Sequence, residues 1–370
     1  MFNNIYLNKK VLVTGHTGFK GTWLTTWLLK LGAEVIGVSD CIPTVPSMFT
    51  ELNLEDKIEH NIFDVRDLNK LRDLILNRKP DFIFHLAAQP IVSESYLNPL
   101  DTISTNVMGT ANVLESIRAL ENACVAIIIT SDKCYENVEW EWGYKETDHL
   151  GGVDIYSGSK GAAEIIFHSY FKSFFSDIKA NVRIATGRAG NVIGGGDWAK
   201  DRIVVDCMKN WANGKTVEIR SPNATRPWQH VLEPLSGYLT LGAELAIHKK
   251  LTGESFNFGP RAEQTKTVVE LLNALSESCD FEGVKVPYEV TDNIPFHEAG
   301  LLKLNCDKAL YHLKWEPTLY YTECVELVSS WYNEFYNSKQ KNMFDLTVGQ
   351  IEKYETLARN RKLNWVGFNG

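Results

Sequence analysis

Short apolar runs alternate with segments of helical periodicity over the first 130 residues of the chain. Four of the runs are expected to form buried strands, at residues 10–15, 34–39, 82–87 and 125–130. Between them, apolar residues recur every three or four positions, which predicts helices at residues 23–31, 68–77 and 103–120. This alternation is typical of consecutive βαβ units. It predicts an α/β fold built on a doubly wound parallel sheet, with four parallel strands by residue 130.

The composition of the chain changes after residue 187. Two segments that together contain Gly, Asn and Trp resemble binding loops, namely GNVIGGGDW and SPNATRPWQH. We therefore expect a dinucleotide-binding domain over residues 1–187, to which 228–259 could return. A smaller substrate-binding lobe is expected over 188–340, and a more polar C-terminal extension over 341–370.

Composition excludes several classes of function. The chain has 370 residues and a net charge of −8, and its Lys and Arg residues form no dense cluster, so we expect no nucleic-acid partner. No long apolar segment or export signal is visible, which predicts no membrane association. The seven cysteines are scattered without a C-x-x-C pair, which favours a reducing cytoplasm and argues against a metal site.

A glycine-rich turn follows the first expected strand. Gly15, Gly18 and Gly21 of GHTGFKG stand three residues apart, where glycine allows a tight turn and lets the backbone approach a pyrophosphate. Thr17 and Phe19 belong to the same turn. Asp40, nineteen residues after Gly21, can accept the ribose hydroxyls and repel a 2′-phosphate, which favours NAD over NADP. The alternative is that the glycines only form a turn and that Asp40 only starts a loop.

Two short segments carry the candidate catalytic groups. Tyr156 and Lys160 are four residues apart, so on a helix they share one face, where the ammonium lowers the tyrosine pKa. The spacing alone is weak, because Tyr6 and Lys10 repeat it. The segment 131–133, Ser-Asp-Lys, follows a strand end, where open parallel sheets bind ligands.

In this order the motifs GHTGFKG, HLAAQP, TSDKCYEN and Y-x-x-x-K resemble the extended short-chain dehydrogenase/reductase superfamily. The later segments EWGYKETDHLGG, GRAGNVIGGGDWAKDRIVVD and ATRPWQHVLEPLSGYL resemble those of the CDP-glucose 4,6-dehydratases. The resemblance implies a Rossmann fold, NAD as cofactor, a nucleotide-sugar substrate and a homodimer or homotetramer. It also implies a lyase reaction in which C4 is oxidised, water leaves from C5 and C6, and the hydride returns to C6.

By the same resemblance, Tyr156 would remove the C4 hydroxyl proton, while Lys160 would lower its pKa and hold the nicotinamide ribose. Ser131 would hydrogen-bond the reacting hydroxyl, and Asp132 would protonate the departing C6 hydroxyl. Lys133 stands where better-known nucleotide-sugar dehydratases carry Glu, and is expected to take the C5 proton. A salt bridge to Asp132 or a solvated loop position is the alternative for Lys133.

The resemblance also assigns residues to the two ligands. Those expected at the cofactor, beyond the glycine turn, are Asp64, Val65, Leu86, Ala87 and Ala88. Those expected at the substrate are Asn191, Arg202, Arg226 and Asn257, since a diphosphate is best held by arginine and amide donors.

Three other functions stay open at this point. A sugar-nucleotide 4-epimerase would share the tyrosine, lysine and serine but would not need Asp132 and Lys133. A 4,6-dehydratase for another nucleotide sugar would differ only in base contacts. A catalytically silent, regulatory NAD-binding protein would be expected to have lost Tyr156 or Lys160, and both are present.

Overall fold

A seven-stranded sheet forms the centre of the computed structural model, which describes residues 1–177, 181–261, 264–281, 287–291 and 301–367. The strand order is β11-β6-β5-β4-β1-β2-β3, and every neighbouring pair is parallel. The strands are β1 (Lys10–Thr14), β2 (Glu34–Ser39), β3 (Glu59–Ile62), β4 (Phe82–His85), β5 (Cys124–Ile129), β6 (Val182–Ala189) and β11 (Ser255–Phe258). The expected doubly wound parallel sheet is confirmed, and its order reverses between β1 and β4.

The structure corrects the expected strand count, because five strands rather than four precede residue 130. The extra one is β3, an edge strand with no fully buried residue, so it lacks the apolar run that marks the others. Helix α1 (Phe19–Lys30) begins directly at the glycine turn, four residues before the expected start. The expected helix 103–120 is divided into α5 (Pro99–Ile103), a π-helical turn (Ser104–Met108) and α6 (Gly109–Arg118).

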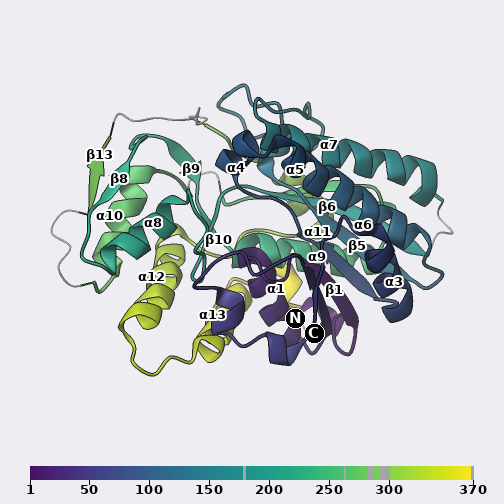
Figure 1. Cartoon of the computed structure of the whole chain (residues 1–370), viewed down its shortest axis with the longest axis horizontal. Coiled ribbons are helices and arrows are strands. Elements are labelled where there is room, and N and C mark those ends of the chain that lie inside the picture. Colours follow the sequence, from purple (N-terminus) through teal and green to yellow (C-terminus); the bar gives the residue numbers. More distant parts are fainter. Residues whose placement is uncertain (178–180, 262–263, 282–286, 292–300, 368–370) are drawn as a thin grey trace.

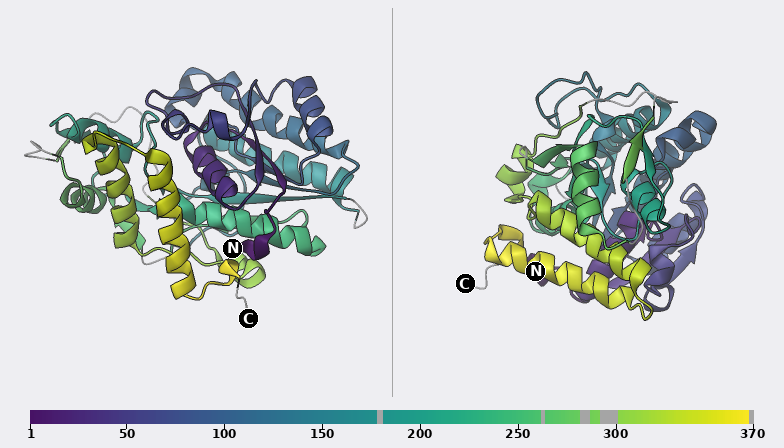
Figure 2. Two further views of the ribbon diagram at one scale, coloured as in Figure 1. Left: turned by 90° about the horizontal axis from the view of Figure 1, so that it is seen from below. Right: turned by 90° about the vertical axis from the view of Figure 1, so that its left-hand side faces the viewer.

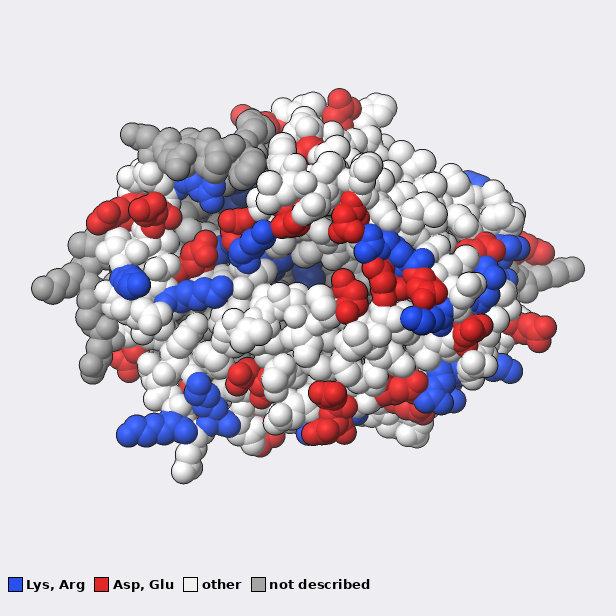
Figure 3. Space-filling view, in the orientation of Figure 1, with Lys and Arg blue, Asp and Glu red and all other residues white. Residues whose placement is uncertain are grey.

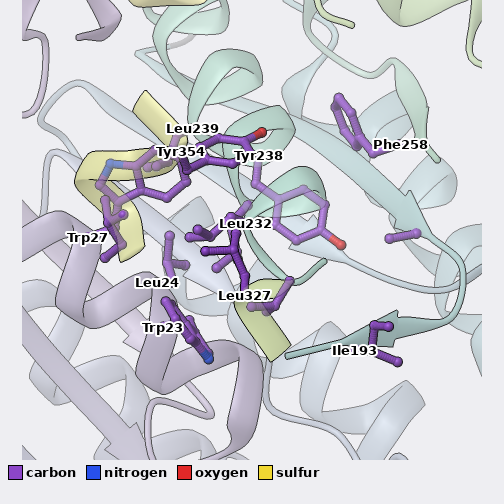
Figure 4. Close-up of a cluster of buried hydrophobic side chains, with 14 of the residues drawn as sticks. Trp23, Leu24, Trp27, Ile193, Leu232, Tyr238, Leu239, Phe258, Leu327 and Tyr354 are labelled. Carbon is purple, nitrogen blue, oxygen red and sulfur yellow. The ribbon is translucent and has the colours of Figure 1, made fainter. Parts of the chain in front are cut away.

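Helices cover both faces of the sheet (Figure 1). Alternate residues of β1 enter different apolar clusters: Val11 and Val13 join the one containing α1 and α9 (Leu232–Ile247), and Leu12 joins the other. That second cluster contains α3 (Leu68–Arg78), α6 and α7 (Ile155–Tyr170). Figure 4 shows the first cluster, where Trp23 and Trp27 of α1 lie near α9. Full burial of each such side chain contributes about 1.5–3 kcal/mol or more.

A smaller lobe lies beside the sheet, at the left of Figure 1. Its strands form two short pairs, β8 with β13 and β9 with β12. Its elements are α8 (Ile203–Trp211), β8 (Val217–Ile219), β9 (Thr225–Pro227), β12 (Thr265–Thr267), α10 (Val268–Ser278), β13 (Tyr288–Val290) and α12 (Tyr321–Asn337). Five further short elements are α2 (Met48–Glu51), α4 (Val92–Leu97), β7 (Val192–Ile193), β10 (Gln229–His230) and α11 (Asp307–Leu313). Between β9 and β12 the chain returns to the large sheet through α9 and β11.

The C-terminal segment, expected as an appended extension, is packed into the molecule. Helix α13 (Met343–Asn360) lies against α1 and α12, as both views of Figure 2 show. Its buried Glu355 accepts hydrogen bonds from Trp27 Nε1 and Lys30 Nζ, both at 2.9 Å. Residues 368–370 of the expected extension lie outside the described residues. Within the described part of the chain, no helix has the length and apolar character of a membrane span.

The Glu355 contacts generate a stability prediction. Glu355→Ala leaves a buried indole N–H and a lysine without their acceptor, so the free energy of unfolding should fall by about 3 kcal/mol. Glu352, 62% exposed and 3.9 Å from the same lysine, provides the matched control, and Glu352→Ala should change it by less than about 1 kcal/mol. Urea denaturation measures both, and equal effects would contradict the docking role of Glu355.

Candidate active site

One cavity of about 610 Å³ lies between the two lobes, at the carboxyl ends of the sheet strands. Nearly all the residues expected from the sequence line it. These are Gly15, Thr17, Gly18, Phe19, Gly21, Asp40, Asp64, Val65, Leu86, Ala87, Ala88, Ser131, Asp132, Lys133, Tyr156, Lys160, Asn191, Arg202 and Arg226. Side chains from segments far apart in sequence therefore meet at a single site.

Two of the three glycines in the turn, Gly15 and Gly21, leave no room for a side chain. Gly15 has φ +75°, and a Cβ there would lie 2.7 Å from the backbone nitrogen of Ala87. A Cβ on Gly21 would lie 2.0 Å from the carbonyl oxygen of Gly15. Gly18 is the N-cap residue of α1. It has no side chain that could accept a hydrogen bond from the N–H groups of the first helical turn, so it leaves these donors uncapped. This close, donor-rich cradle fits the pyrophosphate of a dinucleotide.

Two carboxylates follow the neighbouring strands β2 and β3. Asp40 comes directly after β2, and Thr17 Oγ1 donates to the carbonyl of Cys41 at 2.7 Å, which ties this strand end to the glycine turn. Asp64 accepts from Nε and the backbone N–H of Arg66, both at 2.8 Å. Hydrogen bonding by Arg66 lowers the pKa of Asp64 below its ordinary value. An aspartate side chain thus stands at each of the two positions expected at the adenosine.

Ser131 and Asp132 form the turn that follows β5. Ser131 Oγ donates to Asp132 Oδ1 at 2.9 Å and accepts the N–H of Lys133 at 3.2 Å, so the hydroxyl fixes the turn. Burial raises the pKa of Asp132, although the charge of Lys133 and the hydrogen bond from Ser131 oppose the shift. A carboxyl group that keeps its proton near neutral pH can act as a general acid.

Tyr156 and Lys160 lie on one face of α7, which is capped by Asp154 through the N–H of Ser157. Burial raises the pKa of Tyr156 to about 12, opposed by a hydrogen bond to Ser131. Burial lowers the pKa of Lys160 to about 8, and its Nζ lies 6.0 Å from the tyrosine ring centroid. A cation brought close to the phenol would favour the phenolate that a base requires.

A buried network supports this face of α7. Glu164, one turn after Lys160, pairs with Arg188 of β6 through two hydrogen bonds of 2.9 and 2.8 Å. Its carboxylate also accepts from Thr130, Thr186 and Ser255. The other acceptors of the arginine include the hydroxyl of Tyr135, at 2.7 Å. The network therefore fixes the catalytic helix to strands β5, β6 and β11.

A small hollow opens beside the main cavity and is lined by Asp132, Lys133, Asn191, Arg226, Pro227 and Leu302. Lys133 forms no ion pair with Asp132, so the salt bridge considered from the sequence is absent between these two described residues. Arg202 forms an ion pair with Asp197, and both residues line the main cavity. The candidate groups for C5, C6 and the diphosphate thus lie on one side of the site.

Asn257 is the one expected residue that the structure does not bring to the cavity. Its side chain is fully buried, and Oδ1 accepts from Tyr135 at 2.8 Å. Nδ2 donates to the carbonyls of Tyr144 and Asn305. Because its amide is used within the protein, Asn257 holds β11 against the neighbouring loops, which corrects the expectation that it contacts the substrate.

Seven charged residues of the cavity wall were not singled out from the sequence: Lys20, Asp197, Lys200, Asp201, Asp206, Glu218 and Arg220. The only signal for Lys20 is its place inside the glycine turn. Figure 3 shows Lys and Arg side chains along the hollow across the middle of the molecule. No group of three or more His, Cys, Asp or Glu side chains among the described residues is arranged to hold a metal ion.

Residues 12–328 match the family model described as GDP-mannose 4,6 dehydratase. The chain is 45% identical over 332 residues to a CDP-glucose 4,6-dehydratase of Salmonella typhimurium strain LT2, covering 89% of this chain and 92% of that protein. It is also 26% identical over 360 residues to a CDP-paratose 2-epimerase of Salmonella typhi, covering 87% of this chain and 98% of that protein.

Solved structures share the fold at lower identity. The dTDP-glucose 4,6-dehydratase DesIV of Streptomyces venezuelae, solved with NAD, superposes with a TM-score of 0.74 at 21% identity, covering 88% of this chain and 97% of that one. A UDP-glucose 4-epimerase of Thermotoga maritima, solved with UDP-glucose, gives 0.75 at 20% identity, covering 88% and 99%. Dehydratases and epimerases thus share this architecture.

The packing of the glycine turn predicts the effect of a single methyl group. Gly21→Ala should weaken NAD binding at least tenfold, because the new Cβ forces the turn away from its present path. Gly349→Ala on α13 is the matched control, since a Cβ there meets no atom within 4 Å. Titration followed by protein fluorescence measures the affinities, and wild-type affinity in a folded Gly21→Ala variant would contradict the assignment.

Proposed function

The chain belongs to the GDP-mannose 4,6-dehydratase family, and we propose that it is a hydro-lyase that converts CDP-D-glucose to CDP-4-dehydro-6-deoxy-D-glucose with NAD. The observation that carries the proposal is the near-full-length relationship to a CDP-glucose 4,6-dehydratase. The cavity supports it, because Asp132 and Lys133 stand beside Tyr156 and Lys160 as additional groups that can move protons.

The residues of the first lobe fit NAD. The glycine turn would hold the pyrophosphate, Asp40 the adenosine ribose, and Asp64 with Val65 the adenine. Leu86, Ala87 and Ala88 line the same wall after β4. When bound, NAD supplies the hydride acceptor and donor of the reaction.

Tyr156 is the proposed acceptor of the C4 hydroxyl proton. Ser131 contributes a hydrogen bond that favours the phenolate, and Lys160 holds positive charge beneath the same ligand. Ser131 directly follows Thr130, and Lys160 lies on α7, and the Glu164 network holds both of these segments. The groups that act at C4 are therefore fixed before substrate arrives.

Asp132 and Lys133 are the proposed groups for the loss of water. Asp132 is 4% exposed, and burial raises its pKa, which favours the protonated form that would supply the departing C6 hydroxyl. Lys133 borders both hollows and would accept the C5 proton as a neutral amine. An acid and a base on one turn can act together in a 5,6-elimination.

Asn191, Arg202 and Arg226 are the proposed substrate contacts of the second lobe. They line the same cavity as the glycine turn, and arginine suits a diphosphate because its donors match two oxygens at once. Asn257 is not part of this proposal.

We also propose a homodimer or homotetramer that works in the cytoplasm. Large apolar side chains are exposed on the adjoining elements α4, α5, the π-helical turn and α7, among them Leu97, Leu100, Met108 and Ile165. A second copy of the chain could cover them. All seven cysteines carry free thiols, as in proteins of reducing compartments.

Incubation of the purified protein with NAD and, separately, CDP-, dTDP-, UDP- and GDP-glucose tests the reaction and the base together. Mass spectrometry should detect loss of one water from CDP-glucose alone. Water loss from another sugar nucleotide instead would move the protein to a different 4,6-dehydratase. Exchange of C4 epimers without water loss would identify an epimerase and contradict the roles of Asp132 and Lys133.

Two substitutions separate the chemical steps. Tyr156→Phe removes only the proton acceptor, so turnover should fall at least roughly a hundredfold while NAD affinity is kept. Asp132→Asn should still oxidise C4 but stall before elimination, so absorbance of the reduced cofactor should persist after substrate is added. Rapid-mixing absorbance follows both variants, and full turnover by either would show that its residue lacks the proposed role.

A further inference from the structure

Lys20 lies in the glycine turn, yet its side chain belongs to the reacting end of the cavity. It is the second residue of α1 and lines the cavity with Asp132, Lys160 and Arg202. Its ammonium forms no hydrogen bond or ion pair with any residue that the structure describes, although three N–H donors are available. A half-buried, unpartnered cation in a ligand cavity needs an electrostatic explanation.

The charged groups that shift the pKa of Lys20 identify its neighbours in the cavity. Burial lowers the pKa of Lys20 to about 8, Arg202 and Lys160 add to this, and Asp132 and Asp197 oppose it. The interaction with Asp132 is mutual, because Lys20 is among the groups that oppose the burial-driven rise in the pKa of Asp132. The lysine therefore lies within electrostatic reach of the proposed acid in the cavity that both residues line.

This inference rests on the proposed dehydration. In that step Lys133 takes the C5 proton, the C5–H electron pair forms the C5–C6 double bond, and the C6–O bond breaks. The departing oxygen takes the proton of Asp132 and leaves as water. Asp132 thereby becomes a carboxylate inside the protein, where an isolated negative charge is costly unless a cation is near.

We propose that Lys20 is a positioning residue whose ammonium stabilises the carboxylate that forms on Asp132 as water leaves. The interaction strengthens during the elimination, because the negative charge on Asp132 forms in that step. It therefore lowers the barrier of this step rather than strengthening binding of the ligands. Oxidation at C4 leaves Asp132 protonated and does not depend on Lys20.

Lys20→Met keeps the length of the side chain and removes its charge. In single-turnover mixing with CDP-glucose, C4 oxidation should proceed at nearly the wild-type rate, while water loss slows roughly ten- to a hundredfold. This effect is smaller than that of removing a direct hydrogen-bond donor to a transition state. The reduced-cofactor absorbance should therefore accumulate and decay slowly. Lys20→Arg should restore water loss to within about threefold of wild type, a rescue that requires the charge.

Lys200→Met is the matched control, because Lys200 also lines the cavity but is 57% exposed and pairs with Glu94. It should eliminate water at close to the wild-type rate. Thermal melts and NAD titrations accompany each variant. Unchanged water loss in a folded Lys20→Met variant would overturn the inference, as would weaker NAD binding without slower elimination. Wild-type protein in the same assay tests the proposed dehydration separately, since it must release water whatever the role of Lys20.

Discussion

Glu164 lies beneath the active site, where four described side chains donate hydrogen bonds to one buried carboxylate. Arg188 supplies the charge, and Thr130, Thr186 and Ser255 supply hydroxyl donors from three adjacent strands. Because a buried carboxylate is costly unless every oxygen is satisfied, α7 has one stable position on the sheet. Tyr156 and Lys160 share the face of α7 that carries Glu164, so this constraint sets their position.

Cations outnumber carboxylates among the charged groups around the reacting centre. Lys20, Lys133, Lys160 and Arg202 surround only two carboxylates, Asp132 and Asp197. This local excess of cations around the reacting centre suits the binding of diphosphates, and the same cations act on the acid that must release a proton. At Asp132, burial raises the pKa, while the charges of Lys133 and Lys20 oppose that rise. One set of side chains can therefore serve both ligand binding and proton transfer.

The sequence reveals the parts of the site whose chemistry is local. The glycine turn and the pair Tyr156 and Lys160 are recognisable because their function depends on spacing within one turn of chain. Asn257 was misplaced because its neighbours Tyr135, Tyr144 and Asn305 come from distant segments. Lys20 escaped notice because only packing shows which way a residue of the turn points. β3 was not counted among the predicted sheet strands because an edge strand needs no apolar run.

The proposed reaction couples an internal transfer of hydrogen to the loss of water, and CDP-glucose carrying deuterium at C4 is the substrate that distinguishes it. We predict a product lighter by one water whose deuterium lies at C6, as read by NMR spectroscopy. Such a product requires oxidation, elimination and return of the hydride within one cavity. Deuterium that stays at C4 in a product of unchanged mass, or that is lost to solvent, would contradict the account.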